Sequence, residues 1–175
     1  MDIQNLINDV YDKNAVLSTD FDDYKQFKEL QINAGVRSHI GIINDDNTVK
    51  VVFCHSEGEL EKNGKKLLEF YNSETLAKQV VKYGTIKKLG KYTYHYPHRD
   101  KKDITVHDKY RTLTAFEYES VNYYIKSIKN GYFKKMKYFY LYGNDKTFAK
   151  KWWVSTDGKN WHTVSKKLNS LENLK

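Results

Sequence analysis

The chain has little of several residue types, and each scarcity excludes a class of protein. A single cysteine, Cys54, among 175 residues excludes an internal disulfide and a cysteine-rich zinc module. A single proline excludes a proline-rich linker. No apolar run approaches the roughly 18 residues of a membrane span, and the N-terminus lacks the basic-then-apolar order of a signal peptide. We therefore expect a protein of the reducing cytoplasm that does not contact membranes.

Arginine is also scarce, because only three of the 30 basic residues are arginines. The formal net charge is +8, but it is unevenly distributed. Residues 1–34 hold seven acids and three bases, a net charge of −4, which leaves +12 for residues 35–175. A body with this charge attracts polyanions such as nucleotides and nucleic acids. The alternative is that lysine merely keeps the protein in solution, since specific phosphate recognition favours arginine.

The spacing of apolar residues predicts an α+β domain over residues 35–175, with helices packed on a mainly antiparallel sheet, and a short acidic helical arm over residues 1–34. The aromatic content of 15% argues against disorder. The predicted helices are 2–11, 21–32, 58–71, 73–84, 120–130 and 164–174. The predicted strands are 36–43, 48–55, 92–96, 136–142 and 151–155, and 97–115 is expected to be a long loop.

Few side chains are arranged for catalysis. Cys54 and His55 are neighbours on a predicted strand, so they point to opposite faces and cannot form a thiol–imidazole pair. A buried structural cysteine is the better interpretation. His95 and His98 lie on a segment that is not helical, so their spacing gives no common face for a metal. We expect no metal and no cofactor, and a small hydrolase or nuclease that uses His55 and Glu57 remains an alternative.

Two patterns fit an anionic ligand. The segment 84–90 has a glycine at each end around Lys87 and Lys88, which would let backbone amides and two cations approach a phosphate. The alternative is a helix C-cap followed by a basic turn. Tyr138, Tyr140 and Tyr142 lie on one face of a predicted strand and could stack on bases. The alternative for these tyrosines is packing in a half-buried strand.

Several short motifs over residues 35–175 resemble a family of small uncharacterised phage and prophage proteins. The segments that carry the resemblance are 37–42 with its leading arginine, the acidic turn 45–47, 52–55 with Cys-His, Gly58, 64–68, 84–90, 96–100 ending in Arg-Asp, 137–142 and the tryptophans 152–153. The family's Trp-Asp before Gly58 is Ser56-Glu57 here, so the indole is missing while a carboxylate is kept. The resemblance implies a phage origin and no particular chemistry.

The leading hypothesis is a non-enzymatic phage accessory protein that binds a nucleotide-type anion, either a small nucleotide signal or a nucleic acid, to interfere with host defence. The residues expected to meet this ligand are Arg37, His55, Glu57, Lys87, Lys88, Tyr96, Arg99 and Tyr140. The alternative from another class is a protein–protein inhibitor of a host defence enzyme. Assembly into a homo-oligomer is left open by the sequence.

Overall fold

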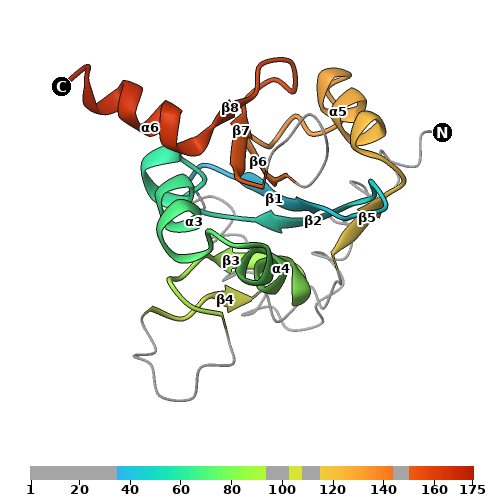
Figure 1. The fold of residues 1–175 in the computed structure, drawn as a ribbon, viewed down its shortest axis with the longest axis horizontal. Helices are drawn as coiled ribbons and strands as arrows, with labels where there is room; N and C mark the ends of the chain where they lie inside the picture. The colour runs from blue at the N-terminus through green and yellow to red at the C-terminus, as the bar shows by residue number, and fades with distance from the viewer. Residues whose placement is uncertain (1–34, 94–102, 108–114, 144–149) are drawn as a thin grey trace, which may run out of the picture.

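The computed structural model describes residues 35–93, 103–107, 115–143 and 150–175, which form a mixed β-sheet with helices on both faces (Figure 1). The predicted α+β class is confirmed, whereas the arm at residues 1–34 lies outside the described residues. The strands are β1 Ser38–Ile43, β2 Val49–Cys54, β3 Ile86–Lys88, β4 Val106–His107, β5 Phe116–Tyr118, β6 Tyr138–Tyr142, β7 Trp152–Ser155 and β8 His162–Thr163. The helices are the π-helical turn η1 Leu60–Gly64, α3 Lys65–Phe70, α4 Glu74–Lys82, α5 Val121–Lys129 and α6 Val164–Glu172. Across these described segments, no helix has the length and apolar character to cross a membrane.

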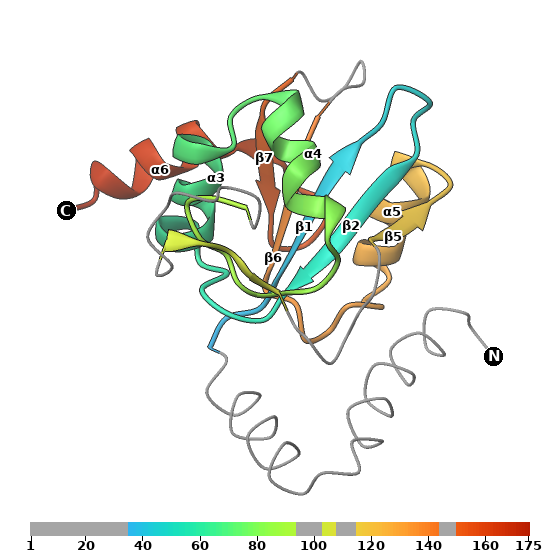
Figure 2. The same cartoon turned by 90° about the horizontal axis from the view of Figure 1, so that it is seen from below.

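The strands follow the order β4-β3-β2-β1-β6-β7-β8, and β5 also pairs with β2. The central strand β1 is antiparallel to β2 and parallel to β6, so that Ser38 lies between Cys54 and Tyr138. On the other side of β2, the parallel strand β3 places Ile86 opposite Cys54. The first residues of β1 and β6 therefore lie beside the last residues of β2, at the same end of these neighbouring strands, as Figure 2 shows.

The predicted hairpin between β1 and β2 is confirmed, and its turn is held by polar side chains. The Asn47 amide donates to the Asn44 carbonyl at 2.9 Å. Asp46 Oδ1 accepts from both the amide and the hydroxyl of Thr48, at 3.0 and 2.6 Å. Asn47 adopts a φ of 68°, a conformation that asparagine tolerates better than most residues. Local turn chemistry therefore fixes the register of the two central strands.

Serine caps begin two of the helices where the sequence predicted them. Ser73 Oγ accepts from the Leu76 amide at 3.2 Å and starts α4. Ser120 Oγ accepts from the Tyr123 amide at 3.1 Å and starts α5. These bonds satisfy backbone donors that the first helical turn leaves without partners.

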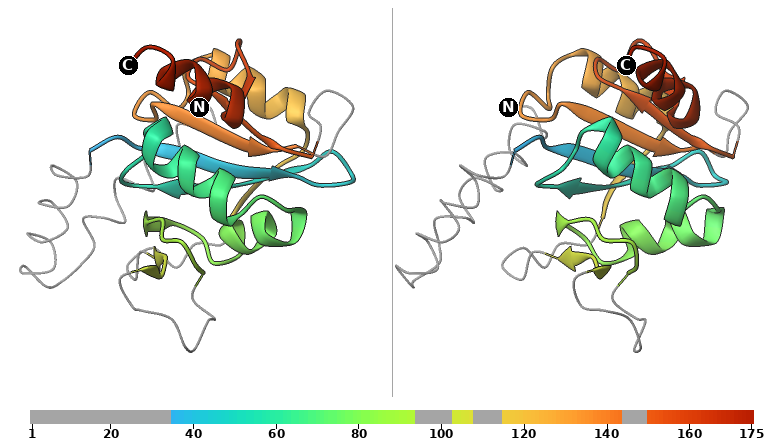
Figure 3. Two further views of the ribbon diagram at one scale, coloured as in Figure 1. Left: turned by 60° about the vertical axis from the view of Figure 1, so that its left-hand side comes forward. Right: turned by 90° about the vertical axis from the view of Figure 1, so that its left-hand side faces the viewer.

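The sheet has a hydrophobic core on each face. Alternation along β6 sends Tyr140 and Tyr142 into one core and Phe139 and Leu141 into the other. The first core also holds residues of η1, α3, α4, β7 and α6, and the second holds residues of α5. Figure 3 shows α3 and α4 on one face of the strands and α5 on the other. Both faces of the central strands are therefore covered.

Four short strands, β3, β4, β5 and β8, were not predicted. Segment 84–90, expected as a cap and basic turn, contains β3, which pairs with β2 and β4. The stretch expected as a long loop contains β4, and β5 follows it directly. Of the predicted strand 92–96, only its first two residues are described, and Tyr92 forms a single bridge with Ile104. Strands of two or three residues are too short to show a period in the sequence.

Candidate functional site: a cationic sheet end

Residues from four strands meet where β1 and β6 begin and β2 ends, and we call this region the sheet end. Arg37 precedes β1, Lys137 precedes β6, and His55 follows β2. Parallel pairing continues past the strands, because the Lys137 amide donates to the Arg37 carbonyl at 3.0 Å. The His55 amide likewise donates to the Ile86 carbonyl at 2.9 Å, next to the lysines of β3. The topology thus gathers basic residues that lie about 100 positions apart in the chain.

The loop after β2 folds back tightly onto the chain that enters β1. The Gly58 amide donates to the Val36 carbonyl at 2.8 Å, and a Cβ at Gly58 would lie 2.8 Å from that same oxygen. The Tyr140 hydroxyl donates to the Gly58 carbonyl at 2.8 Å. The preceding residue, Glu57, has a φ of 57°, which is uncommon for a residue with a side chain. The turn therefore needs glycine at position 58 and holds Glu57 in a strained conformation.

Two lysines from different elements hold the Glu57 carboxylate. Lys66 Nζ of α3 lies 2.6 Å from Oε2 and also donates to the Leu89 carbonyl at 2.9 Å. Lys88 Nζ of β3 lies 3.5 Å from Oε1. Partial burial by itself raises the pKa of Glu57, but the hydrogen bond from Lys66 and the charges of both lysines outweigh it, so the pKa is below its ordinary value. The carboxylate is therefore charged at neutral pH.

A buried polar cluster lies beneath this turn. The Asn63 side-chain amide donates to the Ser56 carbonyl at 3.1 Å and to Cys54 Sγ at 3.3 Å. The Asn63 backbone amide donates to the Glu57 carbonyl at 3.0 Å. Burial raises the pKa of the Cys54 thiol, so it stays protonated near neutrality. Cys54 is fully buried, as predicted for a structural cysteine.

The structure brings five of the predicted ligand residues to the sheet end: Arg37, His55, Glu57, Lys87 and Lys88. Tyr96 and Arg99 lie outside the described residues, and so do His95 and His98. Within the described segments, no group of three or more His, Cys, Asp and Glu side chains is placed to hold a metal ion.

Gly90 leaves no room for the phosphate cradle that was one of the two interpretations of segment 84–90. The Gly90 amide already donates to Thr105 Oγ1 at 3.0 Å. A Cβ at Gly90 would lie 2.4 Å from the Asp103 carbonyl oxygen. Glycine is needed there because another stretch of backbone packs against it, and no space is left for an anion. Lys87 and Lys88 belong instead to the strand β3.

The prediction that Tyr140 stacks on a base is wrong. Tyr138 and Tyr140 do share a face, since their rings lie parallel with centroids 6.2 Å apart. The Tyr140 side chain is 0% exposed, however, and a Cβ at Gly64 would lie 3.2 Å from its hydroxyl. Helices cover this face of the sheet, so the ring has no face left for a ligand. Tyr140 supports the sheet end from within through its bond to Gly58.

Arg37 and Lys137 are like charges at adjacent positions of a parallel ladder. Ser38 points toward Asn63, so strand alternation turns Arg37 and Lys137 to the opposite, α5 side of the sheet. Among the described residues no acid forms an ion pair with either of them. Neighbouring like charges destabilise a sheet, and an anion bound between them would relieve this repulsion.

Sequence reasoning missed Lys66 and Asn63. Lys66 meets Glu57 only because the positive φ of Glu57 and the η1 turn fold nine residues of chain back on themselves. Asn63 lies in that turn, where its amide closes the loop on the Glu57 carbonyl. The one signal available was the pair of glycines at 58 and 64, which marks close backbone approach.

No protein-family model, curated protein or solved structure matches this chain.

Proposed function

We propose that this protein binds a phosphate-bearing, nucleotide-type anion at the sheet end and does not turn it over. The proposal rests on one observation: Arg37 and Lys137 lie side by side with no acidic partner among the described residues. Lys87 and Lys88 of β3 add cations at the same end of the sheet. Phosphate oxygens accept strong charge-assisted hydrogen bonds from such groups.

Binding is favoured over hydrolysis by the state of Glu57. A general base works best with a pKa near the operating pH. Lys66 and Lys88 lower the pKa of Glu57, which takes it further from neutral pH, and each lysine contacts one of its two carboxylate oxygens. Glu57 thus serves to orient Lys66 and Lys88. On the resemblance to phage proteins alone, we further propose interference with host defence in the cytoplasm as the biological setting.

The test is a thermal-shift and calorimetric titration with linear and cyclic nucleotides, inorganic pyrophosphate and a 20-nucleotide strand. A ligand at about a hundred times its dissociation constant stabilises a folded protein by about 2.7 kcal/mol. We expect the ligand to raise the melting temperature of the natural protein, and we expect no such rise in the double variant Arg37→Gln/Lys137→Gln. The matched control, Lys166→Gln/Lys167→Gln on α6, removes the same charge from exposed positions and should keep the shift.

Two results would overturn the proposal. One is that neither the nucleotides, nor pyrophosphate, nor the strand changes the melting temperature at millimolar concentration. The other is that both double variants weaken binding equally, because the effect would then come from net charge and not from the sheet end.

A further inference from the structure

The basic residues of the sheet end are continued along the chain by exposed lysines on α5 and on the turns that follow it. Residues 121–143 contain five lysines and no acidic residue. All five are exposed: Lys126 and Lys129 on α5, Lys134 and Lys135 on the following turns, and Lys137 at the sheet end. The short segment between α5 and β6 therefore carries basic side chains from the exposed side of the helix to the sheet end. We call Arg37 and these five lysines, together with Tyr123, the α5 surface.

Tyr123 is the exposed aromatic residue of this surface. Its side chain is 46% exposed, and it lies one helical turn before Lys126. The other tyrosine of α5 points inward, since Tyr124 is 0% exposed. Packing accounts for Tyr124 but leaves almost half of the Tyr123 side chain open to solvent. An exposed ring beside cations is the combination that holds nucleic-acid bases and phosphates.

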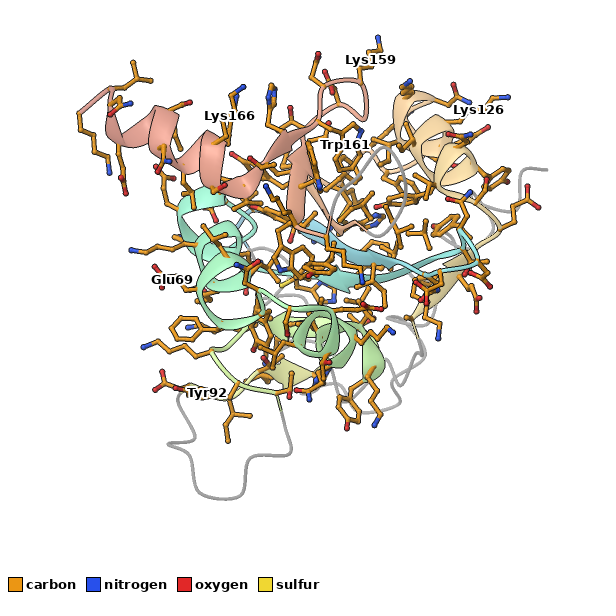
Figure 4. The ribbon with its side chains drawn as sticks, in the orientation of Figure 1. Glu69, Tyr92, Lys126, Lys159, Trp161 and Lys166 are labelled. Atoms are coloured by element: carbon orange, nitrogen blue, oxygen red, sulfur yellow. The ribbon has the colours of Figure 1, made fainter. Side chains whose placement is uncertain are left out.

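The turn between β7 and β8 brings a further cation to α5. A Cβ at Gly158 would lie 2.8 Å from the Ile128 side chain, so the turn packs directly on the helix. Figure 4 shows Lys159 on this turn and Lys126 on α5, both projecting away from the sheet. The acid in the turn, Asp157, accepts from the amides of Lys159 and Asn160. The hydrogen bond from the Asn160 amide, together with that from Lys159, holds the pKa of Asp157 below its ordinary range. The charged carboxylate is therefore held in place by the backbone of its own turn.

The length of the surface points to a strand rather than a single nucleotide. The nine residues of α5 span about 13 Å at a rise of about 1.5 Å per residue. At the duplex rise of about 3.4 Å per phosphate of one strand, the closest spacing of a stacked strand, that length holds at most about four phosphates. Lys134, Lys135 and Lys137 prolong the surface to the sheet end. Glu117 and Glu119, which precede the helix, bound it at the other end.

We propose that the α5 surface binds single-stranded nucleic acid, with its lysines on successive phosphates and Tyr123 stacked on a base. This inference rests on the proposed function, since Arg37 and Lys137 anchor one end of the strand. Single strands fit better than duplexes because stacking on Tyr123 needs an unpaired base with an open face. Lysines contact the phosphates of the nucleic acid and the tyrosine stacks on a base of any type, so we expect binding that does not depend on the nucleotide sequence.

The first test measures the anisotropy of a labelled mixed-sequence 20-nucleotide strand between 50 and 200 mM salt. Six phosphate contacts give a slope of log K against log salt of about −4 for a single strand. Lys126→Gln/Lys129→Gln should reduce that slope by about 1.4 and weaken binding about 25-fold at 0.1 M salt. The control Lys166→Gln/Lys167→Gln on α6 should bind as the natural protein does.

The second test isolates the ring. Tyr123→Leu should weaken binding of the strand at least about fivefold, whereas Tyr123→Phe keeps the ring and should bind normally. A duplex of equal length should bind more weakly than the strand and should not respond to Tyr123→Leu. Circular dichroism confirms that each variant is folded.

The outcomes separate this inference from the proposed function. Strand binding that is lost in Arg37→Gln/Lys137→Gln but unchanged in the α5 variants refutes the α5 surface and leaves the sheet end standing. Equal losses in the α5 and α6 lysine variants, or no effect of Tyr123→Leu, also refute it. Absence of binding to the strand and to every nucleotide refutes both.

Discussion

Acidification should destabilise the protein through one buried histidine. His39, on the central strand β1, is 1% exposed. Its ring centroid lies 4.8, 4.5 and 5.4 Å from those of Phe53, Phe133 and Phe139. Nδ1 lies 2.9 Å from the Tyr124 hydroxyl, whereas Nε2 has no hydrogen-bond partner among the described residues. Burial lowers the pKa of His39 from 6.5 to about 3, because a charged imidazolium would lose its hydration there.

The magnitude follows from proton linkage. Above pH 6.5 His39 is neutral in the folded and unfolded chains, so the full stability is present. Between pH 6.5 and about 3 only the unfolded chain binds the proton, and the free energy of unfolding falls by about 1.4 kcal/mol per pH unit. From pH 7.5 to 4.5 this histidine alone removes about 2.7 kcal/mol, a large fraction of the 5–15 kcal/mol of a typical domain.

The assay is urea unfolding at pH 7.5, 6.5, 5.5 and 4.5. The comparison protein is His39→Leu/Tyr124→Phe, which removes both polar partners and leaves no buried hydroxyl unpaired. His107, whose pKa is also lowered by burial, is present in both proteins and cancels. We expect the natural protein to lose about 2.7 kcal/mol more than the variant over this range. Parallel pH profiles for the two proteins would refute the reasoning, because His39 would then take up its proton in the folded state.

Three further predictions concern stability and are measured by urea unfolding at pH 7.5. Tyr140→Phe removes the buried hydrogen bond to the Gly58 carbonyl and should cost about 1–3 kcal/mol without changing nucleotide binding; an unchanged stability would contradict the role given to this hydroxyl. Gly90→Ala places a Cβ about 2.4 Å from the Asp103 carbonyl oxygen, so we expect a loss of about 1–3 kcal/mol or more, and a neutral effect would speak against the close packing. Ser120→Ala removes the N-cap of α5 and should cost about 1 kcal/mol; a loss below about 0.3 kcal/mol would show that the cap does not hold this helix.

Local signals in the sequence were sufficient for the elements that local chemistry fixes. The turn at residues 44–47 and the caps Ser73 and Ser120 each satisfy backbone groups within a few residues, so the hairpin and two helices could be predicted correctly. The strand β3 could not, because it becomes a strand only by pairing with the edge of β2. Two of its three residues are lysines, which no strand pattern favours.

The candidate site was predicted in part. Alternation correctly placed the tyrosines of β6 on one face, but alternation alone does not show whether a layer of helices covers that face. Here α3, α4 and α6 cover the tyrosine face of β6, and Tyr140 is fully buried beneath them. The basic residues of the sheet end could be named one by one from their charge. Their convergence depends on the parallel pairing of β1 with β6, a long-range contact that leaves no local trace in the sequence.

That same pairing constrains the order in which the chain can assemble. The hairpin of β1 and β2 is complete by residue 54, whereas β6, which borders β1 on its other side, begins only at residue 138. During synthesis the central strand therefore presents an open hydrogen-bonding edge while more than half of the protein is still to be made. Open edges of apolar strands invite pairing with other chains, and distant pairings form slowly because a long loop must close first. Fragments that stop short of β6 should therefore aggregate, and we expect refolding to be limited by the docking of β6.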